Sequence, residues 1–412
     1  MSASPAVTPA ARAARQFSEP RYIVLLALLL GSQPVATDLY LPALPAIAAE
    51  LGNPALTLTG LTLAFGVAQL ILGPLSDRFG RRPVLLAGCA AYALSSLAGA
   101  WVSSLTALII CCCLQGAAMA ALVVCARASV RDLYAPVEGA KALSRGLTGL
   151  GLFALSAPLI GALIVAQFSW HAAFVALGVF GVAAFAWVAF FFDESRPALP
   201  PSGRDNASAA RRKLTDSARF RAWTMMLATS YMTLFCFLLS SGFVYIKVFG
   251  FSPLACGFVL AGNSLSYILG TYWCRHLLKG MAPDRAVSIS SRYSLGGGVL
   301  MLAVALASGA PQAWAMIAGQ YLIAIGHGVN QPCGQAGAVA DFPEQAGRAA
   351  AWSGFTMMLL AFVVGQAIAP FLGQSAWPLV ITNACGGLAI ALSAWIAVRQ
   401  AYATSGASVV HR

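Results

Sequence analysis

The sequence predicts an all-α membrane protein of twelve transmembrane helices, arranged as two six-helix halves related by pseudo-two-fold symmetry. Three observations predict this class: the apolar composition, the division of the chain into twelve apolar runs, and the placement of basic residues in alternate loops. Of the 412 residues, 59% are hydrophobic and 9% are charged. Soluble domains carry about a quarter charged residues, so the composition excludes a soluble or disordered chain.

The apolar runs have the length of about 20 residues that spans a bilayer as a helix. Pro, Gly or charged residues bound each run. The first run continues without a small-residue cleavage site, which predicts an uncleaved helix rather than a secretion signal. The predicted spans are 22–41, 56–75, 83–102, 105–126, 146–166, 172–192, 222–245, 253–274, 286–308, 312–332, 350–372 and 377–398.

Basic residues mark one side of the bilayer. With twelve spans both termini lie on the same side, and if that side is the cytoplasm, 24 of the 25 Lys and Arg residues are cytoplasmic and only Lys247 is outside. Cytoplasmic loops are enriched in Lys and Arg because basic segments resist translocation. The distribution therefore predicts cytoplasmic termini. The net charge of +12 is spread over seven loops and termini, which excludes a nucleic-acid partner.

One long polar segment separates the two halves. It contains Pro197, Pro200, Pro201 and the basic cluster Arg211–Lys213, a composition typical of a solvated linker. The predicted domains are an N-terminal six-helix bundle at 1–192, a cytoplasmic linker at 193–219 and a C-terminal six-helix bundle at 220–412.

Two short matches indicate that the halves are repeats. Ala157–Gly161, with the sequence Ala-Pro-Leu-Ile-Gly, recurs 212 residues later as Ala369–Gly373, with the sequence Ala-Pro-Phe-Leu-Gly. Asp132 after the fourth span has its counterpart 209 residues later in Asp341 after the tenth. Repeats of this kind occur in transporters, whose substrate site lies near the bilayer midplane between the repeats. The repeat therefore predicts a transporter.

The chain lacks the motifs of an enzyme. It contains neither a phosphate-binding Gly-x-x-x-x-Gly-Lys-Ser/Thr loop nor a Gly-x-Ser-x-Gly nucleophile motif, and its four histidines do not have zinc-ligand spacing. The ten cysteines lie in or at the ends of apolar runs, where a free Cys packs as a small hydrophobe. We therefore expect no enzymatic activity, no metal and no cofactor.

The turn between the second and third spans, Gly73–Pro83, has the sequence Gly-Pro-Leu-Ser-Asp-Arg-Phe-Gly-Arg-Arg-Pro. We expect its first Gly to let helices approach closely and its second to adopt a positive φ. The spacing resembles the signature loop Gly-x-Leu-x-Asp-Arg-x-Gly-Arg-Arg of the major facilitator superfamily. The resemblance implies a cytoplasmic gate in which arginines at the inner end of the fourth span are partners of Asp77. The implied gate residues are Gly73, Asp77, Arg78, Gly80, Arg81, Arg127 and Arg131.

Asp38 is the only one of the thirteen acidic residues that falls within a predicted span. An acid in the membrane is costly and is by default a functional candidate. It lies 16 residues after Tyr22, about 24 Å along a helix, which predicts a position in the outer third of the first span. A proton-binding role is our hypothesis, and an acid that simply reaches the outer interface is the alternative.

The segment Asp38–Pro45, Asp-Leu-Tyr-Leu-Pro-Ala-Leu-Pro, resembles the drug-efflux branch of the superfamily. Arg127–Tyr134 resembles the bicyclomycin and chloramphenicol exporters (Bcr/CflA type) of that branch. The resemblance implies a monomeric exporter in the bacterial inner membrane that exchanges protons for a small amphipathic substrate. Cys112 departs from the branch, which has an Arg at this position. This departure keeps open an alternative, a proton-independent facilitator or importer of a small metabolite.

Polar and aromatic side chains within the spans are candidates for a substrate cavity, although each can instead form an interhelical hydrogen bond or a core contact. The candidate cavity residues are Tyr40, Gln115, Tyr231, Asn263, Tyr267 and Gln331. In the fifth span, Pro158 and Gly161 match part of the antiporter motif of the family and are predicted to form a kink. Ala157 and Ala162 stand where the motif commonly has Gly.

Overall fold

A computed structural model describes residues 19–134, 136–195, 214, 216–342 and 345–409, and within them every regular element of secondary structure is a helix. Twelve long helices match the twelve predicted spans, which confirms the fold class. They are α2 (Glu19–Asp38), α4 (Ala55–Phe79), α5 (Arg81–Gly99), α6 (Leu105–Leu133), α7 (Pro136–Gln167), α8 (Trp170–Phe191), α10 (Ala218–Ser241), α11 (Pro253–Leu277), α12 (Pro283–Ala307), α13 (Ala313–Ala340), α14 (Ala346–Ile368) and α15 (Trp377–Val409).

Short helical segments continue three of the long helices. A 3-10 turn, η1 (Leu41–Ala43), and the short helix α3 (Leu44–Leu51) follow α2. A π-helical segment, η2 (Gly242–Val248), continues α10, and a second 3-10 turn, η4 (Ala369–Phe371), continues α14.

Ten of the helical segments in the described residues are long and apolar enough to cross a membrane by length and composition alone. The two that fall short, α5 and α13, carry more polar residues. Arg81 and Arg82 begin α5, and Gln320, His327 and Asn330 lie within α13. The polarity of α13 is the first structural indication that it has a role beyond spanning the bilayer.

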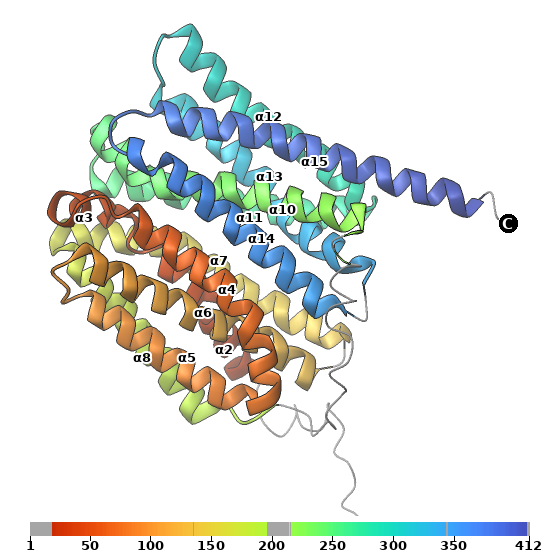
Figure 1. The fold of residues 1–412 in the computed structure, drawn as a ribbon, viewed down its shortest axis with the longest axis horizontal. Coiled ribbons are helices and arrows are strands. Elements are labelled where there is room, and N and C mark those ends of the chain that lie inside the picture. Colours follow the sequence, from red (N-terminus) through yellow and green to blue (C-terminus); the bar gives the residue numbers. More distant parts are fainter. Residues whose placement is uncertain (1–18, 135, 196–213, 215, 343–344, 410–412) are drawn as a thin grey trace, which may run out of the picture.

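The long helices form two groups, which occupy the lower and upper parts of Figure 1. In the first group α4 packs against α6, α2 against α7, and α5 against both α6 and α8. In the second group α12 packs against α13 and α15, and α10 against α14 and α15. The groups meet where α4 packs against α14 and α7 against α11. Most of the predicted linker at 193–219 lies outside the described residues.

The signature segment differs from the expected loop. α4 continues through Phe79, so the turn between α4 and α5 consists of Gly80 alone, whose φ is 102°. The positive φ expected at Gly80 is therefore confirmed. The close helix approach expected at Gly73 is wrong, because a Cβ atom there would have open space around it.

Candidate functional site

The first membrane helix is interrupted at Asp38. α2 ends at this residue, and the chain continues through η1 and α3, so that the helical segment Pro20–Leu51 has 32 residues. Pro42 is the second residue of η1, and Pro45 is the second residue of α3. At the start of a helix a missing backbone N–H costs no helical hydrogen bond. The first span is therefore longer than predicted, and Asp38 lies nearer to its middle than to its end.

The Asp38 carboxyl is buried, with 7% of the residue exposed. Thr37 Oγ1 lies 2.6 Å from Asp38 Oδ1 and 3.1 Å from the carbonyl oxygen of Gln33. Tyr231 of α10 lies within interaction range of both the Gln33 side chain and the Asp38 charge. The predicted acid and one predicted aromatic residue thus meet across the boundary between the two helix groups.

Gly161 positions the interruption in the first helix. It lies so close to Leu39 that a Cβ atom at this position would overlap the Leu39 carbonyl group. On the same turn of α7, the Pro158 carbonyl faces Gly257 of α11, where a Cβ atom would approach it to 3.3 Å. The predicted fifth-span motif therefore contacts α2 on one side and the second helix group on the other. Pro158 itself lies inside α7 without ending the helix.

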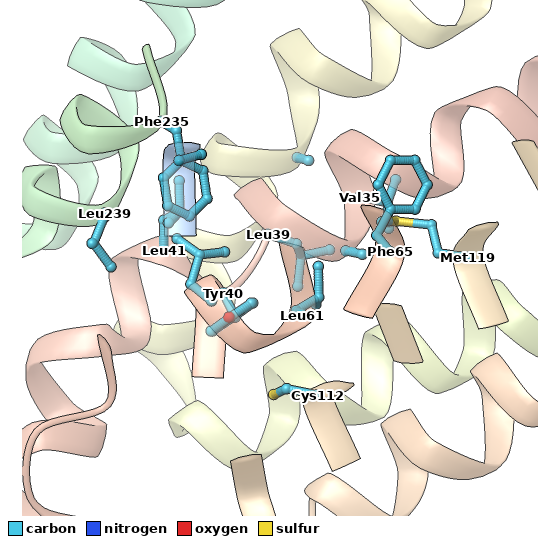
Figure 2. Close-up of a cluster of buried hydrophobic side chains, with 14 of the residues drawn as sticks. Val35, Leu39, Tyr40, Leu41, Leu61, Phe65, Cys112, Met119, Phe235 and Leu239 are labelled. Atoms are coloured by element: carbon cyan, nitrogen blue, oxygen red, sulfur yellow. The ribbon is translucent and has the colours of Figure 1, made fainter. Parts of the chain in front are cut away.

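Apolar side chains surround the interruption. Figure 2 shows Leu41 beside Phe235 and Leu239 of α10. Tyr40 has no exposed surface, and its ring centroid lies 5.3 Å from that of Phe174 of α8. In this structure Tyr40 is thus a core residue of the first helix group. Cys112, which stands where the drug-efflux branch has Arg, is also fully buried and belongs to the same hydrophobic cluster.

Three predicted cavity residues gather around His327 of α13. The ring centroids of Tyr231 and Tyr267 lie 6.4 Å and 5.6 Å from that of His327, and Gln331 interacts with the same imidazole. The Nδ1 atom of His327 lies 2.8 Å from Ser230 Oγ on α10. Sequence reasoning passed over His327 because only zinc-ligand spacing was tested. Its position within the predicted apolar run 312–332 was the signal that could have identified it.

The remaining predicted amides connect helices within one group. Gln115 Nε2 donates to Ser96 Oγ at 2.6 Å. Asn263 Oδ1 accepts from Gln320 Nε2 at 3.1 Å, and Asn383 Nδ2 donates to Gln320 Oε1 at 3.0 Å. For Gln115 and Asn263 these contacts are the interhelical hydrogen bonds that were the alternative to a place in the substrate cavity.

Arg81 is the centre of the signature segment. One guanidinium nitrogen lies 2.6 Å from Asp77 Oδ1, and Nε lies 2.9 Å from Asp132 Oδ2. Burial lowers the pKa of Arg81, but the hydrogen bonds and charges of Asp132 and Asp77 outweigh this effect, so the pKa is raised above its usual value. Arg127 and Arg131 lie exposed on the last two turns of α6. Their pairing with Asp77 stays a prediction.

Glu194, which sequence reasoning missed, caps α5. Its Oε1 accepts from the Arg81 backbone N–H at 2.8 Å, and its Oε2 accepts from that of Arg82 at 3.2 Å. A carboxylate at a helix N-terminus is favoured because the first N–H groups lack helical partners. A Cβ atom at Gly80 would clash with this carboxylate. Position 80 therefore requires glycine, because its φ is positive and because a side chain there would clash with the Glu194 carboxylate.

The second helix group has a related cluster. Arg219, at the start of α10, lies 3.7 Å from Asp341 and 4.0 Å from Asp284. Asp341 is the repeat counterpart of Asp132, so each of the repeated acids faces an arginine. The arginines themselves occupy different positions, because Arg81 begins α5 and Arg219 lies in α10.

Hydrogen bonds join the two groups at the opposite end of the bundle. Gln366 Nε2 of α14 donates to Thr59 Oγ1 of α4. Asn53, between α3 and α4, donates to the carbonyl oxygen of Ala369. Within the described residues, no three His, Cys, Asp or Glu side chains are placed to hold a metal ion.

Twelve long helices in two packed groups, ten of them in segments apolar enough to cross a membrane, together with a buried acid at a helix interruption, indicate a membrane transporter rather than an enzyme. The chain belongs to the Major Facilitator Superfamily, whose family model matches residues 26–359. The signature segment and the two-group packing agree with this assignment.

Curated relatives confirm the resemblance to the drug-efflux branch. The chain is 28% identical to multidrug resistance protein D of Escherichia coli over 366 residues, which is 87% of this chain and 92% of the relative. It is 26% identical to a bicyclomycin resistance protein homolog of Haemophilus influenzae, over 88% of this chain and 93% of the relative. It is 40% identical to a chloramphenicol resistance protein of Pseudomonas aeruginosa over 167 residues, 39% of each chain.

Solved structures share the fold. A bacterial homolog of the human lysosomal transporter Spinster, in an inward-facing and occupied conformation, superposes with a TM-score of 0.66 at 13% identity. The superposition covers 93% of this chain and 96% of the other.

Proposed function

We propose that the chain exports small amphipathic drugs or metabolites across the bacterial inner membrane, driven by proton antiport with alternating access. The observation that carries this proposal is the position of Asp38, buried at the interruption of the first helix and within electrostatic range of Tyr231 of the other helix group. An acid at the boundary between two moving halves can bind a proton in one state and release it in the other.

The relatives support the proposed cargo. The names of three of them refer to resistance to drugs, including bicyclomycin and chloramphenicol. Ala36, Leu39 and Tyr40, which flank Asp38 in the chain, belong to the hydrophobic core, and Thr37 and Gln33 add a hydroxyl and an amide group. Such surroundings suit a compound that is largely apolar and carries a few hydrogen-bonding groups.

The distribution of contacts supports alternating access. The side-chain hydrogen bonds of Asn53 and Gln366 join the two groups at one end, whereas the ion pairs of Arg81 and Arg219 lie within single groups at the other. The second end carries the basic residues of the signature segment, which supports a cytoplasmic position for this end and for both termini. The state proposed for this structure is therefore the one that is closed to the outside.

The test is gradient-driven transport by purified protein in proteoliposomes with an acidic lumen, using radiolabelled chloramphenicol as the probe. Wild-type protein is expected to accumulate the drug, and Asp38→Asn is expected to lose this accumulation because its side chain cannot exchange a proton. Asp193→Asn, which changes an exposed acid after α8, is the matched control. Accumulation by Asp38→Asn at the wild-type level would remove Asp38 from the coupling role.

The alternative function, a proton-independent facilitator or importer of a metabolite, is favoured by Cys112. This residue provides no positive charge where the drug-efflux branch has Arg, and it lies buried in the cluster beside Tyr40. Transport at the same rate with and without a pH gradient would establish the facilitator. A resistance profile of a drug-hypersensitive bacterial strain expressing the chain would identify an exporter and its cargo.

A further inference from the structure

His327 is held in a fixed position between three helices. Its neighbours Gly326 and Gly328 bring α13 close to α12 and α11, since a Cβ atom at Gly326 would clash with Ser294 and one at Gly328 with the backbone of Tyr267. The imidazole itself contacts Ser230 of α10. With 1% of its surface exposed, His327 is one of the most buried polar residues of the chain.

The contacts of the imidazole fix its orientation. Nδ1 lies 2.8 Å from Ser230 Oγ, and Gln331, one turn further along α13, interacts with the same ring. The rings of Tyr231 and Tyr267 lie on two of its sides. A histidine placed only to fill space in an apolar core has no need of partners on three helices.

Among the described residues, the titratable side chains in ring contact with His327 are Tyr231 on α10 and Tyr267 on α11. Asp38 on α2 is in turn within electrostatic range of Tyr231. On α12, Ser294 and Ser290 lie against the neighbouring Gly326, and Ser290 also donates to Asn330. The charged residues of α14 and α15 are Arg348, in the first turn of α14, and Arg399, near the end of α15.

We propose that His327 is a second proton-binding group of the transporter, placed in the C-terminal helix group, whereas Asp38 lies in the N-terminal group, with Tyr231 within reach of both. The inference rests on the proposed proton exchange. In each transport cycle, a neutral imidazole binds one proton at its unprotonated nitrogen, becomes an imidazolium and releases the proton on the other side. Imidazole is the side chain whose ordinary titration falls in the physiological pH range. Proton binding is then shared by the two helix groups that move against each other.

The experiment compares two assays on the same proteoliposomes, with radiolabelled chloramphenicol as the probe. Accumulation driven by an acidic lumen requires net proton movement, whereas counterflow at equal pH requires only exchange of one drug molecule for another. His327→Gln keeps hydrogen-bonding groups but cannot carry a charge. We expect it to lower gradient-driven accumulation by at least about tenfold and to leave counterflow within about twofold of wild type. His276→Gln, at the exposed end of α11, is expected to match wild type in both assays.

The outcomes separate the two levels of the proposal. Wild-type protein without gradient-driven accumulation overturns the proposed function. If wild-type protein and His327→Gln show equal gradient-driven accumulation, only the present inference is overturned. The inference is also overturned if His327→Gln loses counterflow together with accumulation, because this result indicates a structural role for His327.

Ser230→Ala provides a second variant in case His327→Gln does not fold. It keeps the imidazole and removes the partner of Nδ1. Its pH profile of accumulation is expected to shift by about 0.5 pH unit or more, with counterflow unchanged. An unaltered profile overturns the inference.

Discussion

The side-chain amide of Asn53 donates a hydrogen bond of 2.8 Å to the carbonyl oxygen of Ala369 and thereby joins the two helix groups. Its Oδ1 accepts a second hydrogen bond of 3.0 Å from the backbone N–H of Ala55, at the start of α4. One side chain therefore caps a helix in the first group and holds the end of α14 in the second. In the proposed cycle this contact must break whenever the transporter opens to the outside.

Replacement of Asn53 is expected to weaken the closed end. Asn53→Asp keeps an oxygen to cap α4 but loses the donor to Ala369, a hydrogen bond worth about 1 kcal/mol. A change of this size shifts an open–closed equilibrium about fivefold. Hydrogen–deuterium exchange of residues 53–59 and 366–371 is expected to be faster in Asn53→Asp than in wild type. Equal exchange in the two proteins would show that the hydrogen bond does not hold this end closed.

The Glu194 carboxylate is expected to stabilise the signature segment. Glu194→Ala removes the acceptor of the Arg81 and Arg82 backbone N–H groups, and loss of a helix cap typically costs about 1 kcal/mol. The apparent melting temperature in detergent is expected to fall by a few degrees. Asp193→Ala, which removes the neighbouring exposed acid, is the control and is expected to melt like wild type. Identical melting of the two variants would contradict the capping role.

The fold could be predicted because its determinants are local. The length of each apolar run and the positions of the basic residues are read directly from the sequence, and all twelve predicted helices are present. The predicted helix boundaries are wrong where a helix extends beyond its apolar run. α4 remains helical through Phe79, and the first span continues through α3 to Leu51, because a helix can extend beyond the residues that would lie in the bilayer.

The site was predicted only in part, because its contacts depend on how distant helices are rotated about their axes. Residue type alone selected Asp38, Tyr231 and Tyr267, and the structure places Tyr231 within electrostatic range of Asp38 and both tyrosines beside His327. Residue type also selected Gln115, which instead bonds to a neighbouring helix of its own group. Glu194 and Arg81 are 113 residues apart, and no local pattern links a carboxylate after α8 to the start of α5.

Gly161 is expected to be sensitive to the addition of a single methyl group. The Cβ atom of Gly161→Ala would overlap the Leu39 carbonyl, so α7 must move away from the segment that carries Asp38. We expect reduced chloramphenicol accumulation in proteoliposomes with folded protein still recovered. Gly296→Ala, on α12, adds the same methyl group where no atom lies within 4 Å and is expected to transport normally. Equal transport by the two variants would show that the close contact at Gly161 is dispensable.

Tyr231 and Tyr245 lie on the same continuous helix, so replacing each with Phe compares the loss of a hydroxyl near Asp38 with the loss of a buried hydroxyl elsewhere. Tyr231 interacts with Gln33 and Asp38 across the group boundary, whereas the Tyr245 hydroxyl is buried and has no hydrogen-bond partner among the described residues. Tyr231→Phe is expected to lower gradient-driven chloramphenicol accumulation several-fold. Tyr245→Phe removes an unsatisfied buried hydroxyl, which costs about 1–3 kcal/mol, and is expected to transport like wild type with equal or higher thermal stability. If both variants transport like wild type, the Tyr231 hydroxyl has no part in coupling the two halves.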